Sequence, residues 1–271
     1  MKYNQLNKIF IIIIIILMTS CEQIFEYSPY QVKVANDDKN QNSKNINKLI
    51  EKDNGEFSDF KIALIGDTHT FYDEFLDIVG VLNKRDDIDF IIHVGDITTS
   101  ATNREFIWLS EILNKFNKPI ITIIGNHDYL SNGQYVYEEM FGPTNFVFNY
   151  HNCKFVIFDD VIWEKDVEDP DFDWFNENLK NDNNFTHVIP LSHIPPWDEQ
   201  FSYGNELIYN YILYTNNIKF SAHGHTHHFD TIRPYPQIGN IKYLTTDDIG
   251  DRHFVVLTIK KDDIIVENIA Y

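Results

Sequence analysis

Short apolar runs alternate with amphipathic stretches along most of the chain, and each apolar run ends in polar residues. The first three runs read FKIALI, FIIHV and PIITII, and residues 73–83 and 103–116 between them have the apolar spacing of helices. This order predicts strand, helix, strand, helix, strand, with right-handed crossovers in a parallel sheet. In an open sheet of this kind, ligands bind beyond the carboxyl ends of the strands.

The second half of the chain contains more strands than a simple doubly wound fold requires. NFVFNY and KFVIFDD predict a hairpin, residues 171–179 predict a helix, and five further strands are expected in HVIPLSH, IKFSAH, KYLTT, HFVVLTIK and DIIVENIAY. Two sheets packed face to face, with helices outside them, accommodate this pattern. We therefore predict an α/β fold with two sheets, formed as a single domain over residues 58–271.

The N-terminus has the layout of an export signal. Lys2 and Lys8 precede an apolar run over residues 9–18, which small or hydroxyl side chains and Cys21 follow. The run is about half the 20 apolar residues that a membrane-spanning helix needs. It resembles a bacterial lipoprotein signal, which favours a signal peptide over residues 1–20 and a lipid on Cys21. Simple secretion and a short retained anchor are the weaker alternatives.

The segment after Cys21 is polar. It is rich in Asn, Asp, Lys and Gln, as in VANDDKNQNSKNINKLIEKDNGEF, and offers little apolar surface to bury. We expect residues 21–57 to form a flexible tether between the lipid and the domain. The protein would then be exported to the cell envelope and held on a membrane, on its periplasmic or cell-surface face.

The charge of the chain is strongly acidic. Its 22 Lys and Arg stand against 41 Asp and Glu, a net charge of -19. Because the average surface repels a nucleic-acid backbone, no stable nucleic-acid binding is expected. An anionic small substrate needs a local positive centre, such as a bound metal ion.

Carboxylate, amide and imidazole side chains follow five of the predicted strands. Such mixed ligands suit divalent zinc, manganese or iron, and seven of them exceed what one tetrahedral ion takes. They suit two ions that share a carboxylate. A solvated loop is the alternative for the histidines of SAHGHTHHFD taken alone. The seven candidate ligands are Asp67, His69, Asp96, Asn126, His193, His225 and His227.

These motifs, GDTH, GD, GNHD, SH and GHTH in this order, resemble those of the calcineurin-like metallophosphoesterases. The resemblance covers about residues 61–229 and implies the α/β/β/α sandwich of that family. It also implies a metal centre in which Asp67, His69 and His227 hold one ion, Asn126, His193 and His225 hold the other, and Asp96 bridges them.

The resemblance further implies a role for two residues next to the ligands. His127 would lie beside the scissile phosphate as a catalytic group, and Asp128 would orient it. GDITTS lacks the arginine that protein serine/threonine phosphatases carry in this segment, and Thr99 stands where purple acid phosphatases have a tyrosine ligand. The sequence therefore resembles the broad group with cyclic-nucleotide phosphodiesterases and assorted phosphatases.

The expected function is hydrolysis of a small phosphate ester. The motifs leave open whether this is a monoester or a diester, and nucleotide-related esters are among the candidates. Two divalent ions lower the pKa of a bridging water, and the resulting hydroxide attacks phosphorus in line with the leaving oxygen. The alternative is a surface protein that keeps the fold and binds a metal or ligand without catalysis.

Other histidines have plainer interpretations. His93 lies within an apolar run and is expected to be a hydrogen-bonded core residue. His223 and His228 flank two candidate ligands, which leaves both a supporting contact and a solvated loop position open for them.

Overall fold

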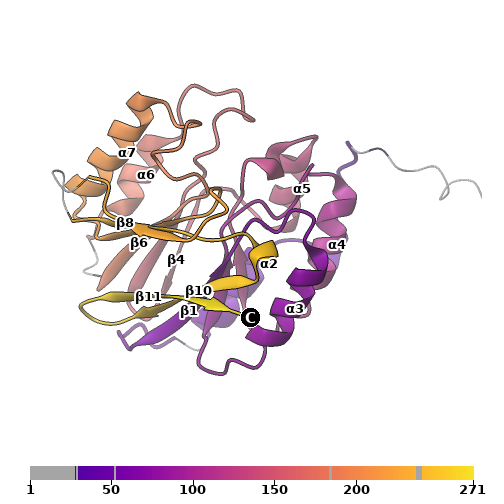
Figure 1. Cartoon of the computed structure of the whole chain (residues 1–271), viewed down its shortest axis with the longest axis horizontal. Coiled ribbons are helices and arrows are strands. Elements are labelled where there is room, and N and C mark those ends of the chain that lie inside the picture. The colour runs from indigo at the N-terminus through magenta and orange to yellow at the C-terminus, as the bar shows by residue number, and fades with distance from the viewer. Residues whose placement is uncertain (1–27, 29, 52, 183–184, 236–239) are drawn as a thin grey trace, which may run out of the picture.

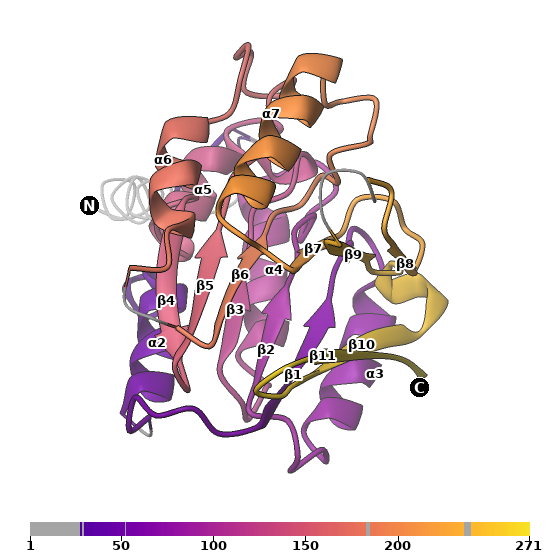
Figure 2. The ribbon, with the colours of Figure 1, turned by 90° about the vertical axis from the view of Figure 1, so that its left-hand side faces the viewer.

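Two β-sheets lie face to face between two layers of helices (Figures 1 and 2). The computed structural model describes residues 28, 30–51, 53–182, 185–235 and 240–271. The predicted signal peptide and Cys21 lie outside these residues. The layered arrangement confirms the predicted fold class.

The first sheet combines parallel and antiparallel strands in the order β11-β10-β1-β2-β3. Its parallel part has the register Ala63 opposite Ile91, and Ile91 opposite Ile120. As predicted, consecutive parallel strands are joined by helices. The strands are β1 (Phe60–Ile65), β2 (Phe90–His93), β3 (Ile120–Thr122), β10 (His253–Ile259) and β11 (Ile264–Ala270).

The second sheet has the order β4-β5-β6-β7-β9-β8. The predicted hairpin is present as the antiparallel pair β4 and β5, while β5, β6, β7 and β9 run parallel. The sequence did not predict β8, which is only three residues long and mostly exposed. The strands are β4 (Phe146–Tyr150), β5 (Cys153–Ile157), β6 (His187–Leu191), β7 (Phe220–His223), β8 (Asp230–Ile232) and β9 (Lys242–Thr245).

The long helices cover the outer faces of the sheets. Figure 1 shows α6 and α7 on one side of the molecule and α3, α4 and α5 on the other. None of the helices in the described ranges is both long and apolar enough to cross a membrane. Their bounds are α3 (Tyr72–Leu82), α4 (Asn103–Leu113), α5 (Gly133–Met140), α6 (Phe172–Leu179) and α7 (Tyr203–Thr215), and the short 3-10 turns are η2 (Asn36–Asp38), η3 (His127–Tyr129) and η5 (Ile249–Asp251).

The strands are apolar on both faces because each sheet is covered twice. In β1, Ile62 and Leu64 pack into the cluster between the sheets. Ala63 and Ile65 belong to the cluster that includes the helix residue Phe75. Alternate side chains of a strand point to opposite faces, so one apolar run supplies both clusters.

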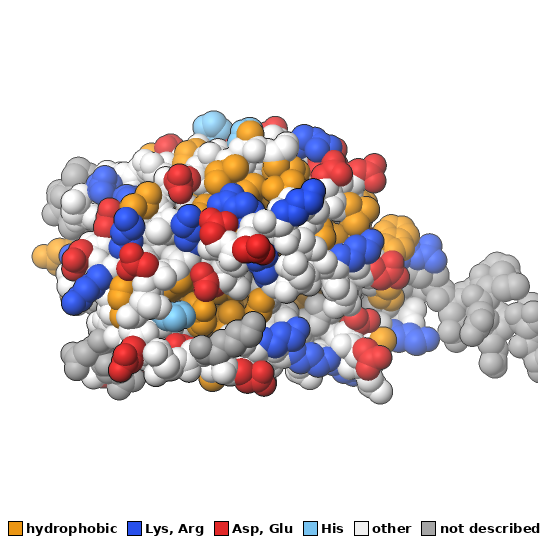
Figure 3. Space-filling model, turned by 90° about the horizontal axis from the view of Figure 1, so that it is seen from below, with side chains coloured by type: hydrophobic (Ala, Val, Ile, Leu, Met, Phe, Trp, Pro, Cys, Tyr) orange, Lys and Arg blue, Asp and Glu red, His pale blue; other side chains and the backbone are white. Residues whose placement is uncertain are grey.

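The surface seen from below carries charges of both signs. In Figure 3, Lys and Arg side chains lie among Asp and Glu side chains and apolar patches. Basic and acidic side chains are therefore intermixed over the described part of this face.

The prediction of a flexible tether is wrong for much of residues 21–57. The helix α2 (Gln41–Ile50) docks on the domain, with Leu49 buried in the core. Before it, Val34 is buried and the carbonyl oxygen of Lys33 accepts a hydrogen bond from Asn103 Nδ2 at 3.0 Å. The folded unit therefore begins near residue 30, and residue 58 is not its boundary.

The polar side chains of α2 cover the open edge of the first sheet at β3. Asn42 donates from Nδ2 to the carbonyl oxygen of Thr122 at 2.9 Å, and its Oδ1 accepts from Thr122 N at 2.8 Å. One turn on, Asn45 Nδ2 donates to the carbonyl oxygen of Ile120 at 2.7 Å. The amides therefore bond the main chain of β3 as a further strand would, which protects the edge from other chains. The same polarity that suggested a tether makes this contact.

We predict that Asn42→Ala lowers the free energy of unfolding by about 1 to 3 kcal/mol, because it leaves the buried N–H of Thr122 without an acceptor. Urea unfolding of the two proteins measures the difference. The matched control is Asn47→Ala on the exposed side of α2, which should change the free energy by less than about 0.5 kcal/mol. Equal stability of the Asn42→Ala protein and the parent would show that the side chain of Asn42 does not stabilise this edge.

Candidate metal centre

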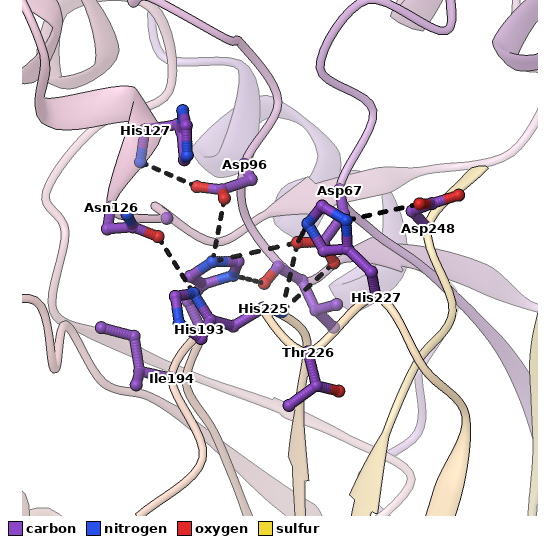
Figure 4. A network of polar contacts seen from close by, with 12 residues as sticks. Asp67, Asp96, Asn126, His127, His193, Ile194, His225, Thr226, His227 and Asp248 are labelled. Carbon is purple, nitrogen blue, oxygen red and sulfur yellow. Dashed lines mark hydrogen bonds and ion pairs between the residues drawn. The ribbon is translucent and has the colours of Figure 1, made fainter. Parts of the chain in front are cut away.

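The carboxyl ends of strands from both sheets meet at one edge of the sandwich. Asp67 and His69 follow β1, Asp96 follows β2, and Asn126 lies beyond β3 in the first sheet. From the second sheet, His193 follows β6, and His225 and His227 follow β7. All seven predicted ligands gather in this place, as Figure 4 shows for six of them.

Two groups of candidate ligand atoms share one residue. Atoms of the first group lie within 4.8 Å of one another, and so do those of the second. The first comprises Asp67, His69, Asp96 and His227, and the second comprises Asp96, His193 and His225. Asn126 joins the second group through Oδ1, which is 3.1 Å from His225 Nδ1. The side chain of Asp96 thus stands between the two groups.

The facing atoms are poorly satisfied by protein contacts alone. His69 Nε2 and His227 Nε2 lie 3.2 Å apart. His193 Nε2 is buried and lies 3.3 Å from Asp96 Oδ2 without making a hydrogen bond. Buried polar atoms normally find partners. A divalent cation would serve as a common partner for imidazole nitrogens and carboxylate oxygens, so the residues fit such an ion.

Burial and neighbouring charges set the protonation of this group. Burial raises the pKa of the Asp96 carboxyl, but the imidazoles of His193, His127 and His69 outweigh it, so the pKa lies far below its ordinary value. For His193, burial alone would lower the pKa. The negative charges of Asp96 and Asp67 outweigh the effect of burial and raise the pKa of His193 to about 10. The Asp96 carboxyl therefore remains deprotonated. A metal ion that binds His193 would have to displace the proton of the His193 imidazole.

Glycines before the ligands allow backbone and ligands to approach closely, as the GD and GNHD motifs suggest. A Cβ on Gly125 would lie 2.2 Å from both N and Oδ1 of Asp96. Gly95 has a φ of 106°, and a Cβ there would lie 2.4 Å from His193 Nδ1. Any side chain at these positions would push the shared carboxylate or its imidazole partner out of place.

The ligand backbone itself is strained. Few residues other than glycine adopt positive φ, and non-glycine residues that do so cluster at functional sites. Five of the seven candidate ligands have φ between 45° and 69°: Asp67, His69, Asp96, His225 and His227. These turns aim consecutive strand-end side chains at one point.

Asp128 does not orient His127, contrary to the expectation from the resemblance. Its carboxylate is buried and accepts hydrogen bonds from the main-chain N–H groups of Ile97, Thr98 and Gly125 at 3.2, 2.9 and 3.0 Å. Burial followed by the charge of Asp96 raises the pKa of Asp128 to about 6. Asp128 thus ties the loop after β2 to the loop after β3.

The imidazole of His127 is oriented by the main chain instead. Its Nδ1 lies 2.8 Å from the carbonyl oxygen of Thr99, to which a proton on Nδ1 can be donated, and this leaves Nε2 available. The ring lies edge-on to that of His69, with 4.7 Å between the ring centroids. The backbone N–H of His127 donates to Asp96 Oδ1 at 2.9 Å. His127 is therefore placed beside the candidate ligands.

Three further histidines, His93, His223 and His228, lie outside the group of candidate ligands. His93 is fully buried, its Nε2 lies 2.7 Å from Thr68 Oγ1, and burial lowers its pKa to about 3, which confirms a core role. His223 is buried between Ser192 and Ser221, so neither interpretation left open for it is correct. His228 is exposed.

The sequence motifs do not include three acidic residues that lie next to the ligands. Glu164, Asp198 and Asp248 lie on loops that carry none of the recognised motifs, and each contacts one candidate ligand. No local pattern marks them, because their partners lie 21 to 38 residues away along the chain.

Comparison with known proteins places this geometry in a family. The model of the calcineurin-like phosphoesterases matches residues 60–229. The 3',5'-cyclic adenosine monophosphate phosphodiesterase CpdA of Haemophilus influenzae is 24% identical over 191 residues, which cover 62% of this chain and 69% of that protein. A "Probable cyclic nucleotide phosphodiesterase" of Coxiella burnetii is 24% identical over 193 residues, 64% of this chain and 77% of that protein.

A solved structure shows the same fold. The purple acid phosphatase PPD1 of yellow lupin superposes with a TM-score of 0.64 at 14% identity, covering 79% of this chain and 52% of that one. The chain thus spans about half the length of that phosphatase. The family match and the two relatives support a phosphoester hydrolase over a binding protein without catalysis. This chain belongs to the calcineurin-like phosphoesterase family.

Proposed function

We propose that the protein hydrolyses a small phosphodiester with the help of two divalent metal ions, manganese, zinc or iron. Asp67, His69 and His227 would hold one ion, and Asn126, His193 and His225 would hold the other. Asp96 would contribute its carboxylate to both. The observation that carries this proposal is the presence of Asp96 in both groups of converging ligand atoms.

Two bound ions supply a Lewis acid for the phosphoryl oxygens and lower the pKa of water, so that a nucleophile forms near neutral pH. The residues of the chain fix the positions of the metal ligands and transfer a proton. His127 donates from Nδ1 to the carbonyl oxygen of Thr99 and presents Nε2, which, when it carries a proton, donates that proton to the leaving oxygen and is left as the neutral imidazole. Asp128 keeps the two ligand loops together and takes no part in the transfer.

The surroundings of the centre favour a substrate of low charge. Glu164, Asp198 and Asp248 add three carboxylates around the ligands. A phosphodiester carries one negative charge at neutral pH, whereas a monoester carries nearly two, so the monoester is repelled more strongly. The names of the two bacterial relatives point to cyclic nucleotides among the diesters. Nucleic acid is not proposed as a stable partner, because the net charge of -19 opposes it.

Removal of metal should abolish hydrolysis of an aryl phosphodiester, and Mn²⁺, Zn²⁺ or Fe²⁺ should restore it. In Asp96→Asn the shared negative charge is lost, so both ions should bind more weakly and kcat/KM should fall. Elemental analysis and a hydrolysis screen over monoesters, diesters and cyclic nucleotides measure these effects. Two ions retained with full activity in Asp96→Asn would refute the bridging role.

Loss of His127 should depend on the leaving group. In His127→Ala, alkyl or nucleotide esters should fall by about 10²- to 10⁴-fold in kcat/KM, while esters of acidic phenols should change little, because their leaving oxygen needs no proton. The measurement is a plot of log kcat/KM against leaving-group pKa, with metal content determined for each protein.

The comparison variants for His127 are a ligand and its sequence neighbour. His225→Ala should lose metal and hydrolyse all esters poorly. Asp128→Asn should lower stability and metal content, because an amide cannot accept all the main-chain hydrogen bonds that the carboxylate accepts. A uniform loss in His127→Ala together with loss of metal would make His127 a ligand.

We also propose that the protein is exported and held at the cell envelope by a lipid on Cys21. The support is the sequence alone: two lysines, an Ile-rich run and a cysteine in the order of a lipoprotein signal. In Cys21→Ser, lipid attachment and signal cleavage should fail. Normal processing and unchanged partitioning into the detergent phase of Triton X-114 would argue against the lipid.

A further inference from the structure

The amide of Asn126 is held in one orientation by a residue outside the family motifs. Its Nδ2 donates to Glu164 Oε1 at 2.9 Å. Its Oδ1 lies on the side of the ligand group, 3.1 Å from His225 Nδ1. Only the oxygen of a neutral amide can bind a cation, so a flipped amide would present hydrogens to the ion. The contact with Glu164 opposes this flip.

The second carboxylate oxygen of Glu164 has no hydrogen-bond partner among the described residues. Glu164 follows β5 on the loop toward α6, and this oxygen, Oε2, is buried. Partial burial of a carboxylate costs free energy unless its contacts compensate. The bond from Asn126 offsets part of this cost, which connects the burial of Glu164 to the orientation of one candidate ligand.

Two further carboxylates approach ring nitrogens of the ligand histidines, at longer distances than that between Glu164 and Asn126. His225 has Nδ1 toward Asn126, while its Nε2 lies 3.5 Å from Asp198 Oδ1 and 3.4 Å from Gln200 Nε2. His227 has Nε2 toward Asp67 and Nδ1 at 3.4 Å from Asp248 Oδ2. A carboxylate that accepts the proton of one ring nitrogen leaves the lone pair of the other nitrogen for an ion.

We propose that Glu164, Asp198 and Asp248 are positioning residues, each of which fixes the orientation or tautomer of one ligand to the metal ions. This rests on the proposed function, in which the ions bind to those ligands. Glu164 and Asp198 act on the ion held by Asn126, His193 and His225, and Asp248 acts on the other ion.

Glu164 offers the cleanest test of the three. Asp198 Oδ1 also accepts from the N–H of Gln200 at 2.9 Å, and Asp248 Oδ1 accepts from the N–H of Asp251 at 3.0 Å, so both shape their own turns. Glu164→Ala removes the bond to Asn126. Glu164→Gln keeps an oxygen acceptor for it and removes only the charge, which separates orientation from electrostatics.

The experiment measures Mn²⁺ binding to the full-length chain by competition with a chelating dye, without any hydrolysis assay. In Glu164→Ala, one of two ions should bind about 10- to 100-fold more weakly, the usual cost of losing such a support, while the other is unchanged. Glu164→Gln should bind both within threefold of the parent. The matched control is Glu168→Ala, which removes an exposed charge from the same loop and should have no effect.

Several outcomes would overturn the inference. Unchanged affinity in Glu164→Ala would do so, and so would equal weakening in Glu164→Gln, because the charge alone would then matter. If Glu164→Ala does not fold, as judged by thermal unfolding in EDTA, Asp198→Ala on its separate loop must weaken the same single ion. A parent that binds fewer than two Mn²⁺ would refute the proposed two-ion function instead.

Discussion

Asp96 carries a buried carboxylate whose two oxygens face groups from both halves of the sandwich. Oδ1 accepts from the backbone of His127, which follows β3 of the first sheet, and Oδ2 faces His193 from the second. Neither sheet alone could surround this charge. The packing of the two sheets therefore determines the distance between the ligand sets, and any shift of one sheet against the other changes both sets at once.

The apolar interior between the sheets gives this arrangement its rigidity. Leu64, Ile92 and Ile121 of the first sheet pack in one apolar cluster with Ile157 and Leu191 of the second. Leu64, Ile92 and Leu191 each lie two to four positions before a candidate ligand, namely Asp67, Asp96 and His193. Close-packed interiors resist small displacements. The strand ends that carry the ligands are thus supported by the buried apolar cluster between the sheets.

The sequence was sufficient for the parts of the structure that repeat a local pattern. Strands with apolar runs and the ligands at their ends were predicted because period, turn glycines and motif order all agree. It failed where one residue meets a distant backbone. No local pattern around Asn42 indicates that it bonds Thr122, 80 residues away. Likewise, no local pattern indicates that the carboxylate of Asp128 bonds the N–H groups of Ile97 and Thr98 and not its neighbour His127.

The docking of α2 on β3 has a consequence for the order of events during synthesis. Chains emerge from the ribosome N-terminus first, at about 5 to 20 residues per second. Asn42 therefore leaves several seconds before Thr122, with which it pairs across 80 positions. When β3 emerges from the ribosome, the residues of α2 that will cover its edge have already emerged as part of the same chain. Pairing of β3 with the edge strand of another newly made chain therefore competes with α2, which is present at high effective concentration because it belongs to the same chain.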